Sequence, residues 1–245
     1  MNKEHKISII TVTKNSEKYL QENIDSLSNQ TYKNFDHLII DGKSSDKTIE
    51  IIKKNLNKIS YWESKIDNGL YDAMNKGIKN ATGDIIGILN SDDFYYANAL
   101  SIVNDYFTKY PNIDFLFGSV QKYKLMHGFY PKKIKWTFGF YTSHSVGFFI
   151  RKSSQSKLGY YDTQYKYSAD YDLFYRMIVK KKMIGMSTKK NEIMGKFRQG
   201  GISSKLKYLD FLKENNKIRI NNGQNKIYVY FIFLLRALRN FNRFF

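Results

Sequence analysis

The sequence contains no cysteine, so it can form neither disulfide bonds nor thiolate metal sites. No apolar run reaches the roughly 18 residues that a membrane-spanning helix needs. Residues 1–6 are polar and lead directly into a strand-like segment, without the pattern of a signal peptide. Together these absences favour a cytoplasmic protein in a reducing compartment.

Acidic residues are also scarce, with 22 Asp and Glu against 40 Lys and Arg, which gives a formal net charge of +18. Such an excess favours anionic partners, namely nucleic acid, anionic lipid or phosphorylated substrates. An equally good explanation is compositional drift, because Lys, Asn, Ile and Tyr are over-used throughout the chain.

What the sequence does contain is enough apolar material for a sizeable core: 42% of its 245 residues are hydrophobic, which argues against disorder. We predict a main domain over residues 1–205, with halves 1–95 and 96–205, and a basic, aromatic helical tail over residues 206–245. Strand-like segments alternate with helix-like segments four times in the first half. This rhythm predicts an α/β fold with a doubly wound, mostly parallel sheet. The predicted strands of the first half are residues 6–12, 35–40, 61–66 and 84–89.

The second half mixes the two element types and predicts an extension of the sheet rather than a repeat. Helical periodicity marks residues 98–110 and 169–180. The predicted strands are residues 114–120, 121–125, 144–150 and 192–198.

Two adjacent carboxylates, Asp92 and Asp93, follow the apolar segment from Ile85 to Leu89. Such a run reads as a buried parallel strand, and ligands of open α/β sheets gather beyond the carboxyl ends of strands. Two acids at that place suit a hard divalent cation that grips phosphate oxygens. A turn with a solvated Asp pair would explain the Ser-Asp-Asp alone, but not together with the partner segments below.

Five ordered segments resemble the family 2 glycosyltransferases of bacterial surface-polysaccharide assembly. They are Ile-Ser-Ile-Ile-Thr-Val-Thr-Lys-Asn (7–15), Ile-Ile-Asp-Gly-Lys-Ser-Ser-Asp-Lys-Thr (39–48), Asp-Asn-Gly-Leu-Tyr-Asp-Ala-Met-Asn-Lys-Gly (67–77), Leu-Asn-Ser-Asp-Asp (89–93) and Ser-Ala-Asp-Tyr-Asp-Leu-Phe-Tyr-Arg (168–176). The resemblance covers about residues 5 to 200. It implies a GT-A fold, a nucleotide-sugar donor bound by residues 1–95, an acceptor half at 96–205, a Mn²⁺ or Mg²⁺ ion and inversion at the anomeric carbon.

The resemblance also assigns residues. Asp93 is expected as the direct metal ligand, and Asp92 contacts the ribose or supports the water shell of the metal. The expected donor-binding residues are Thr11, Val12, Thr13, Asn15, Asp41, Asp67, Asp72, Asn75, Ser91 and Asp92. Asp72 and Asn75 are expected to share a helix face. The chain departs from the common Asp-Asp-Gly-Ser form of the family because Gly42 replaces the acid that faces uracil in many members, so a UDP-sugar is an expectation. Asp41 alone would be read as a loop-capping carboxylate.

Inverting transfer needs a base that takes the proton of the acceptor hydroxyl. Asp170 occupies the place where the family carries Glu-Asp, with Ala169 in place of the Glu, and is our candidate base. Asp172 is the rival, although its position suggests a structural role. A lone Asp at a helix N-terminus is most often a cap, and only the motif raises Asp170 above that.

Two further residues are expected near the acceptor or the diphosphate. His144 either binds a substrate oxygen or satisfies a backbone group. Arg198, with the glycines at 200 and 201, either closes over the diphosphate, whose oxygens arginine fits well, or is part of an exposed basic loop.

The end of the chain carries nine consecutive apolar residues, 227–235, followed by arginines interleaved with Leu and Phe as far as residue 245. A basic, aromatic helix too short to span a bilayer is typical of an interfacial anchor. We therefore predict a peripheral protein on the anionic inner face of the plasma membrane, with a lipid-linked glycan as acceptor. Packing of the tail on its own domain and a dimer contact are the alternatives.

Two other functions remain to be weighed. A nucleotidyltransferase that makes sugar nucleotides would open with a glycine-rich phosphate loop, but residues 7–15 contain no glycine. A nucleic-acid-binding protein is suggested by the charge alone, and no reading helix or aromatic platform accompanies it. We expect no nucleic-acid partner.

Overall fold

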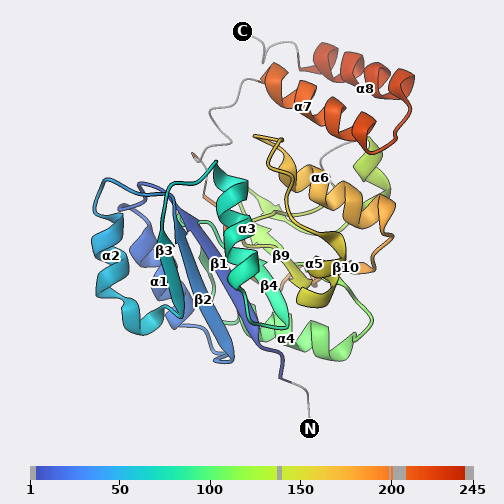
Figure 1. Ribbon diagram of the computed structural model, residues 1–245. Helices are drawn as coiled ribbons and strands as arrows, with labels where there is room; N and C mark the ends of the chain where they lie inside the picture. Colours follow the sequence, from blue (N-terminus) through green and yellow to red (C-terminus); the bar gives the residue numbers. More distant parts are fainter. Residues whose placement is uncertain (1–3, 137–139, 199, 201–207, 241–245) are drawn as a thin grey trace.

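The computed structural model describes residues 4–136, 140–198, 200 and 208–240 (Figure 1). Its centre is a seven-stranded sheet of order β10-β6-β9-β4-β1-β2-β3. The strands are β1 (Ile7–Thr13), β2 (Phe35–Asp41), β3 (Tyr61–Ser64), β4 (Ile85–Ile88), β6 (Phe115–Phe117), β9 (Phe148–Arg151) and β10 (Gly185–Ser187). β1 pairs in parallel with β2 and β4, β2 pairs in parallel with β3, and β9 runs antiparallel between β4 and β6. The predicted doubly wound, mostly parallel sheet is confirmed.

Helices cover both faces of this sheet, because β1 is buried along its whole length and offers apolar side chains to each side. Ile10 packs with α3 (Leu70–Asn80) in one core, and Ile9 packs with α4 (Ala99–Lys109) in the other. At Gly77 of α3 a Cβ atom would lie 2.3 Å from Ile10 Cγ2. The glycine therefore lets this helix approach the central strand closely. The remaining helices of the first half are α1 (Leu20–Ser28) and α2 (Thr48–Lys54).

A second, four-stranded sheet of order β5-β11-β7-β8 covers the acceptor half. Its strands are β5 (Phe94–Tyr95), β7 (Ser119–Gln121), β8 (Leu125–Met126) and β11 (Ile193–Lys196). The predicted strand 114–120 is wrong in one respect: it is divided between β6 and β7, which belong to different sheets. The predicted strand 121–125 is mostly the turn between β7 and β8. Gly118, at the division, lies against Met194, where a Cβ would come within 2.1 Å of Met194 Cγ.

The boundaries of other elements also differ from the predicted ones. Of the predicted strand 144–150, only the part from residue 148 is extended, as β9, and α5 (Lys152–Leu158) follows it unpredicted. β10 was also not predicted. The helix predicted at 169–180 is α6 (Ala169–Tyr175), continued by a π-helical turn, Arg176–Lys180.

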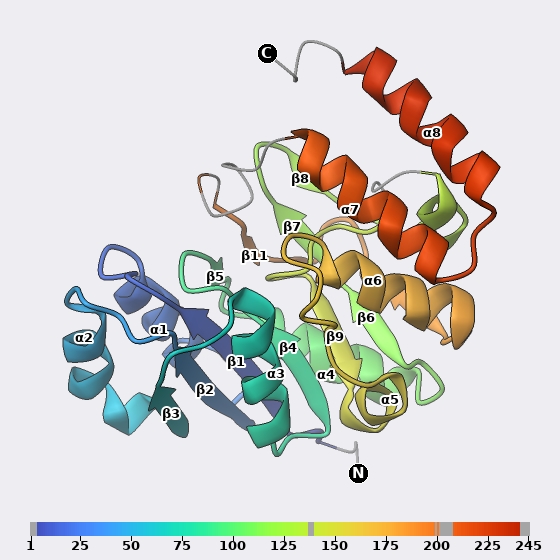
Figure 2. The ribbon, with the colours of Figure 1, turned by 45° about the horizontal axis from the view of Figure 1, so that its top comes forward.

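The chain ends in a pair of helices, α7 (Tyr208–Asn221) and α8 (Lys226–Arg239), with α8 outermost (Figures 1 and 2). α7 is part of the main domain rather than a detached tail, since its Ile218 lies in the large core and its Glu214 accepts the backbone N–H groups of Tyr167 and Ser168. α8 buries Val229 and Ile232, and it exposes six large apolar residues, named below. Packing on the domain, one of the alternatives for the tail, therefore holds for α7. Residues 241–245 lie outside the described part of the chain.

Candidate active site

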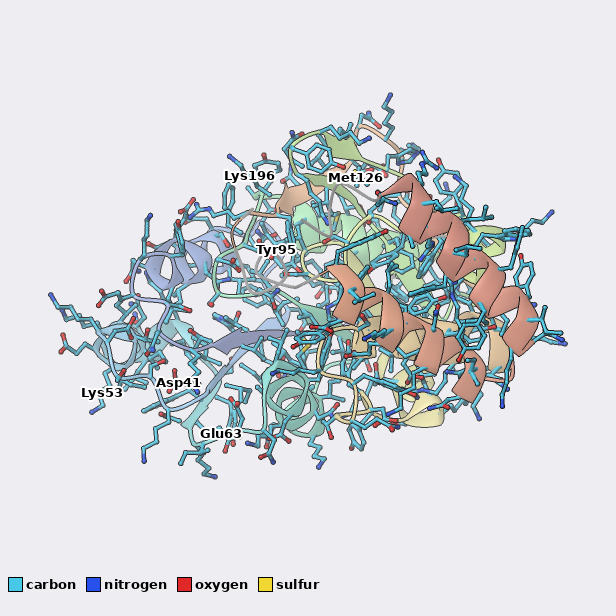
Figure 3. All side chains as sticks on the ribbon, turned by 90° about the horizontal axis from the view of Figure 1, so that it is seen from above. Asp41, Lys53, Glu63, Tyr95, Met126 and Lys196 are labelled. Carbon is cyan, nitrogen blue, oxygen red and sulfur yellow. The ribbon has the colours of Figure 1, made fainter. Side chains whose placement is uncertain are left out.

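The carboxyl ends of the parallel strands β1 and β2 lie at the top of Figure 1, and Asp41, at the end of β2, is labelled in the view from above in Figure 3. β2 and β4 lie on opposite sides of β1, so the strand order reverses direction there. A reversal of this kind is where open α/β sheets bind ligands. Two buried side-chain atoms at this edge have no hydrogen-bond partner, Thr13 Oγ1 after β1 and Asn90 Oδ1 after β4. Buried polar atoms are usually paired, so these two point to a ligand or water at this place.

Asp93 is the buried member of the acidic pair, with 1% of its surface exposed. Its Oδ2 accepts a hydrogen bond from Ser145 Oγ at 2.5 Å, and its Oδ1 accepts one from the backbone N–H of Arg198 at 2.9 Å. Burial, and next the charge of Asp92, raise the pKa of Asp93 to about 7. The carboxylate therefore ties the loop after β11 to the end of β4.

Asp92 is the accessible member. Its side chain is only partly buried, and burial raises its pKa while the Arg198 guanidinium lowers it. The sequence predicted Asp93 as the direct metal ligand and Asp92 in support. The geometry favours the reverse, because the Asp93 side chain is almost wholly buried whereas that of Asp92 is partly exposed.

Among the described residues, no three His, Cys, Asp or Glu side chains are grouped so that they could hold a metal ion by themselves. The turn at the end of β4, closed by the bond from Asp93 N to Asn90 O at 2.9 Å, nevertheless presents the Asp92 carboxylate and the unpaired Asn90 Oδ1. Mg²⁺ and Mn²⁺ take such oxygens, and Mg²⁺ commonly uses one or two carboxylates together with substrate phosphates. The turn therefore fits a cation that shares its ligands with a diphosphate. The sequence did not predict Asn90 as a site residue, because only the tertiary packing leaves its Oδ1 buried without a hydrogen-bond partner.

Asp170, at the start of α6, is surrounded by tyrosines. Its Oδ1 accepts the Tyr71 hydroxyl at 3.1 Å and the Tyr171 N–H at 2.9 Å, and its Oδ2 accepts the Tyr141 hydroxyl at 3.3 Å. Burial, and then the charge of Asp170, raise the pKa of Tyr71 and of Tyr141 well above the ordinary value, so both act as donors. A carboxylate has about four accepting positions, and Oδ2 keeps one of its two.

His144 lies beside this group, and its ring contacts a side chain of that group's surroundings. Its Nε2 lies 2.6 Å from the Tyr161 hydroxyl. Burial lowers the pKa of His144, against the opposite effect of Asp170, so the ring is neutral at pH 7. This contact is with a side-chain hydroxyl rather than a backbone group, and the expected contact of His144 with a substrate oxygen stays a prediction.

The loops after β1 and β2 are fastened to each other. Asn15 Oδ1 accepts the Ser45 N–H at 2.9 Å, and Asn15 N–H donates to Ser44 Oγ at 2.8 Å. Asp41 is 1% exposed and accepts bonds from Ser44 and from Ser64 Oγ, the latter at 2.6 Å. In this structure the Asp41 carboxylate therefore caps the loop, and its side chain has almost no exposed surface with which to contact a nucleotide.

Gly42 makes room for a different acid. A Cβ atom at this position would lie 2.5 Å from Asp67 Oδ2. The Asp67 carboxylate thus occupies the space where a side chain at residue 42 would lie. Asp67 belongs to the loop before α3, and its Oδ1 accepts the Gly69 N–H at 3.0 Å.

Several other predicted donor contacts are not supported by the geometry. Thr11 is buried, with its hydroxyl 2.9 Å from His37 Nε2, and Val12 packs in the core, because side chains alternate between the faces of the sheet. Asp72 and Asn75 do not act together. Asp72 accepts the Asn68 N–H and pairs with Lys76, and Asn75 is buried.

Asn75 makes two 2.9 Å hydrogen bonds with the backbone of Tyr161, one in each direction. Its role here is to fasten α3 to the segment before α6. Ser91 is also buried, with its hydroxyl 2.8 Å from that of Ser16. It joins the turn after β4 to the loop after β1 and so helps to shape the edge.

Arg198 is held over the site from the side of β11. Its guanidinium lies 4.6 Å from the Tyr19 ring centre and 5.5 Å from that of Phe94, and it forms an ion pair with Glu22. This is an ordered position rather than an exposed basic loop. Gly200 has φ of 103°, and residues 199 and 201–207 lie outside the described residues.

Sequence analysis missed Lys122, which follows β7. Burial lowers the pKa of Lys122, whereas Asp93 and, to a smaller extent, Asp170 raise it. Lys122 Nζ lies 4.1 Å from the ring centre of Phe197, the residue before Arg198, whose N–H binds Asp93. Nothing in the sequence marks one lysine among so many, and only the pairing of β7 with β11 brings it here.

A family model described as "Glycosyl transferase family 2" matches residues 8–167. The chain belongs to this family. An uncharacterized glycosyltransferase of Rickettsia typhi is 31% identical over 188 residues, which cover 70% of this chain and 58% of that protein. The PGL/p-HBAD biosynthesis glycosyltransferase of Mycobacterium bovis is 26% identical over 219 residues, covering 84% of this chain and 82% of that protein. The chain thus spans little more than half of the Rickettsia relative.

Solved structures show that this family 2 member shares the GT-A fold. S. aureus TarS 1–349 in complex with UDP-GlcNAc matches with a TM-score of 0.71 at 19% identity, covering 96% of this chain and 73% of that chain. The mannosyltransferase PcManGT from Pyrobaculum calidifontis, in complex with GDP-Man and Mn²⁺, matches with a TM-score of 0.65 at 14% identity, covering 96% and 70%. The GT-A fold expected from the sequence is confirmed.

Proposed function

We propose that this protein is an inverting, metal-dependent glycosyltransferase that moves a sugar from a nucleotide-diphosphate donor, a UDP-sugar, to a hydroxyl of a lipid-linked glycan. The observation that carries the proposal is a short chain of contacts that connects acids 77 positions apart in sequence, Asp93 and Asp170 (170 − 93). Asp93 accepts a hydrogen bond from Ser145, and the neighbouring His144 contacts Tyr161. Tyr161 stacks on Tyr71, which donates to Asp170. Family 2 membership and the UDP-GlcNAc complex of TarS support the donor class.

In this proposal Asp170 is the base. Three protein donors orient its carboxylate, and Oδ2 keeps a position for the proton of the acceptor hydroxyl. Attack by that hydroxyl on the anomeric carbon breaks the bond to the diphosphate in a single displacement, so the configuration inverts. The barrier falls as the transition state loosens towards an oxocarbenium-like state.

Asp92 and Asn90 Oδ1 would hold the cation. A bound Mg²⁺ or Mn²⁺ ion supplies Lewis-acid neutralisation of charge on the diphosphate. The neutral His144–Tyr161 pair and the tyrosines around Asp170 make that side of the site less polar. Less competition from water strengthens the interaction of Asp170 with an acceptor hydroxyl.

A thermal-shift screen tests the function directly. We expect UDP or a UDP-sugar, together with Mn²⁺, to raise Tm by several degrees, because a ligand that binds only the folded state stabilises it by about 2.7 kcal/mol at a hundred times its Kd. The matched variant Asp67→Asn removes the charge beside Gly42 and is expected to reduce the shift with UDP. The proposal would be contradicted if Tm were the same in buffer and with every nucleotide. Release of pyrophosphate from a nucleoside triphosphate would also contradict it.

The membrane part of the proposal rests on α8. Within the described residues no helix is both long and apolar enough to cross a bilayer. α8 instead exposes a continuous apolar face, and Trp136 packs edge-on against its Tyr228 at 5.0 Å between ring centres. The exposed residues of this face are Ile227, Tyr230, Phe231, Leu234, Leu235 and Leu238. Exposed cations flank it: Lys132, Lys133, Lys135, Lys226 and Arg239.

This combination of apolar, aromatic and cationic residues is what the surface of an anionic bilayer recognises. We expect the protein to sediment with vesicles that contain phosphatidylglycerol and much less with neutral vesicles. Phe231→Ser with Leu234→Ser should weaken binding at least about tenfold, given the apolar area removed. Leu56→Ser, at a leucine that is 48% exposed far from α8 in sequence, is the control and should bind normally. If light scattering instead shows a dimer that only the α8 variant disrupts, the face is a contact between copies.

A further inference from the structure

Lys122 has a defined position at the edge of the active site. Phe197 N–H donates to Gln121 O at 2.9 Å, which fixes the end of β7 beside the end of β11. Lys122 Nζ then lies 4.1 Å from the centre of the Phe197 ring. The next residue, Arg198, donates its N–H to Asp93. The lysine is therefore held one residue away from the segment that touches the acidic pair.

The ammonium group has unmet hydrogen-bonding capacity. It carries three donors, and it is partly removed from water. Among the residues that the structure describes, no carboxylate lies within 4.0 Å of Lys122 Nζ and no acceptor binds it; its close contact is the aromatic ring. Cation–π contact stabilises the charge without satisfying the N–H groups.

The chemistry of the site has a matching need. Asp92, Asp93 and Asp170 bring negative charge to a place where a diphosphate must bind. Lys122 contacts Phe197, the residue directly before Arg198, so its ammonium lies beside the segment that binds Asp93. The diphosphate of the donor lies on the same side in the proposed function.

We propose that Lys122 binds the β-phosphate of the donor and is a catalytic cation for departure of the nucleoside diphosphate. This inference rests on the proposed function. The acceptor oxygen forms its bond to the anomeric carbon while its proton passes to Asp170. The bond from that carbon to the β-phosphate oxygen breaks, and both electrons of the bond remain on that oxygen. The ammonium of Lys122 neutralises the negative charge that this places on the phosphate. Lysine suits this task because it binds phosphate as a point charge.

The test compares binding of a nucleoside diphosphate and its monophosphate, since only the diphosphate has the group that Lys122 is proposed to hold. The ligands are UDP and UMP, or the corresponding pair with the base that stabilises the protein best. Titration calorimetry in EDTA measures the protein without a metal ion. The variants are Lys122→Met, Lys122→Arg and Lys124→Met. Lys124 is exposed and two residues away, so its variant has the same change of net charge.

We expect Lys122→Met to weaken UDP binding about tenfold or more and to leave UMP binding unchanged, since a hydrogen bond to a charged group is lost. Lys122→Arg should keep most of the UDP affinity, and Lys124→Met should bind both ligands as the unaltered protein does. With Mn²⁺ and a sugar donor, Lys122→Met should lower kcat more than it raises KM.

Three results would overturn the inference. UDP affinity of Lys122→Met equal to that of Lys124→Met would show that no phosphate contact exists. Equal weakening of UDP and UMP would place the effect in the structure of the site rather than on the β-phosphate. An unaltered protein that binds no nucleoside diphosphate, either in EDTA or with Mn²⁺, would remove the proposed function itself, and the role of Lys122 with it.

Discussion

Asp170→Asn is expected to lower kcat for sugar transfer by about 10²- to 10⁴-fold, the range over which a positioned general base contributes. The amide keeps the shape of the carboxylate and can still accept the Tyr71 hydroxyl or the Tyr171 N–H. It cannot take a proton from the acceptor. Donor binding should therefore change little, which calorimetry with the donor and Mn²⁺ would show beside the transfer assay.

Asp172→Asn is the matched control, two residues along the same helix. Asp172 accepts Arg176 Nε at 2.8 Å and Asn222 Nδ2 at 2.8 Å, so it fastens α6 to α7. Breaking a buried ion pair costs about 3–5 kcal/mol, so this variant should lose thermal stability and keep most of its kcat at low temperature. A folded Asp172→Asn protein without activity, next to an active Asp170→Asn protein, would show that the base has been assigned to the wrong carboxylate.

Asp92→Asn and Asp93→Asn are expected to differ, although the residues are adjacent. Loss of the accessible carboxylate at residue 92 should lower metal-dependent kcat/KM by roughly 10²- to 10³-fold, because a metal ion contributes several kcal/mol of charge stabilisation. Asn at residue 93 can still accept the Arg198 N–H, and Ser145 can reverse its bond. That variant should stay within about tenfold of full activity. Transfer assays across a Mn²⁺ titration measure both, and a larger loss at residue 93 would restore the original assignment.

Asp93 also carries a pH dependence whose sign can be worked out. Its folded-state pKa, about 7, exceeds the ordinary value of 3.8, so between these values the folded protein holds more protons than the unfolded chain. Stability from this group is then fully present at low pH and is lost as pH rises towards 7. In EDTA, the Tm of the unaltered protein should fall relative to that of Asp93→Asn between pH 4.5 and about 8, as unfolding scans would show. If the two proteins gave parallel curves of Tm against pH, the raised pKa of Asp93 would be contradicted.

The strand-end acids show how far sequence reasoning reaches. Asp92 and Asp93 were found because a buried strand ends before them, a signal that lies within ten residues. Their exposure could not be predicted, because the burial of Asp93 depends on Ser145 and on the Arg198 backbone, which are 52 and 105 positions away from it. Which of the two binds the metal ion stays a prediction. The same holds for Asn75: its place on α3 was predicted, but its partner is Tyr161.

By itself the sequence determined the α/β rhythm, the parallel arrangement of the first four strands and the family, because each of these depends on local periodicity or on motifs of a few residues. The tertiary structure alone decided which oxygens stay free to act. Burial and hydrogen bonds between distant segments enclose the carboxylates of Asp41 and Asp93, whereas Asp92 stays partly exposed, Asn90 Oδ1 stays unpaired and Asp170 Oδ2 keeps one accepting position. The tertiary structure likewise decided that Lys122 lies over Phe197 and that Asp67 fills the space beside Gly42, since both depend on how the strands and loops pack.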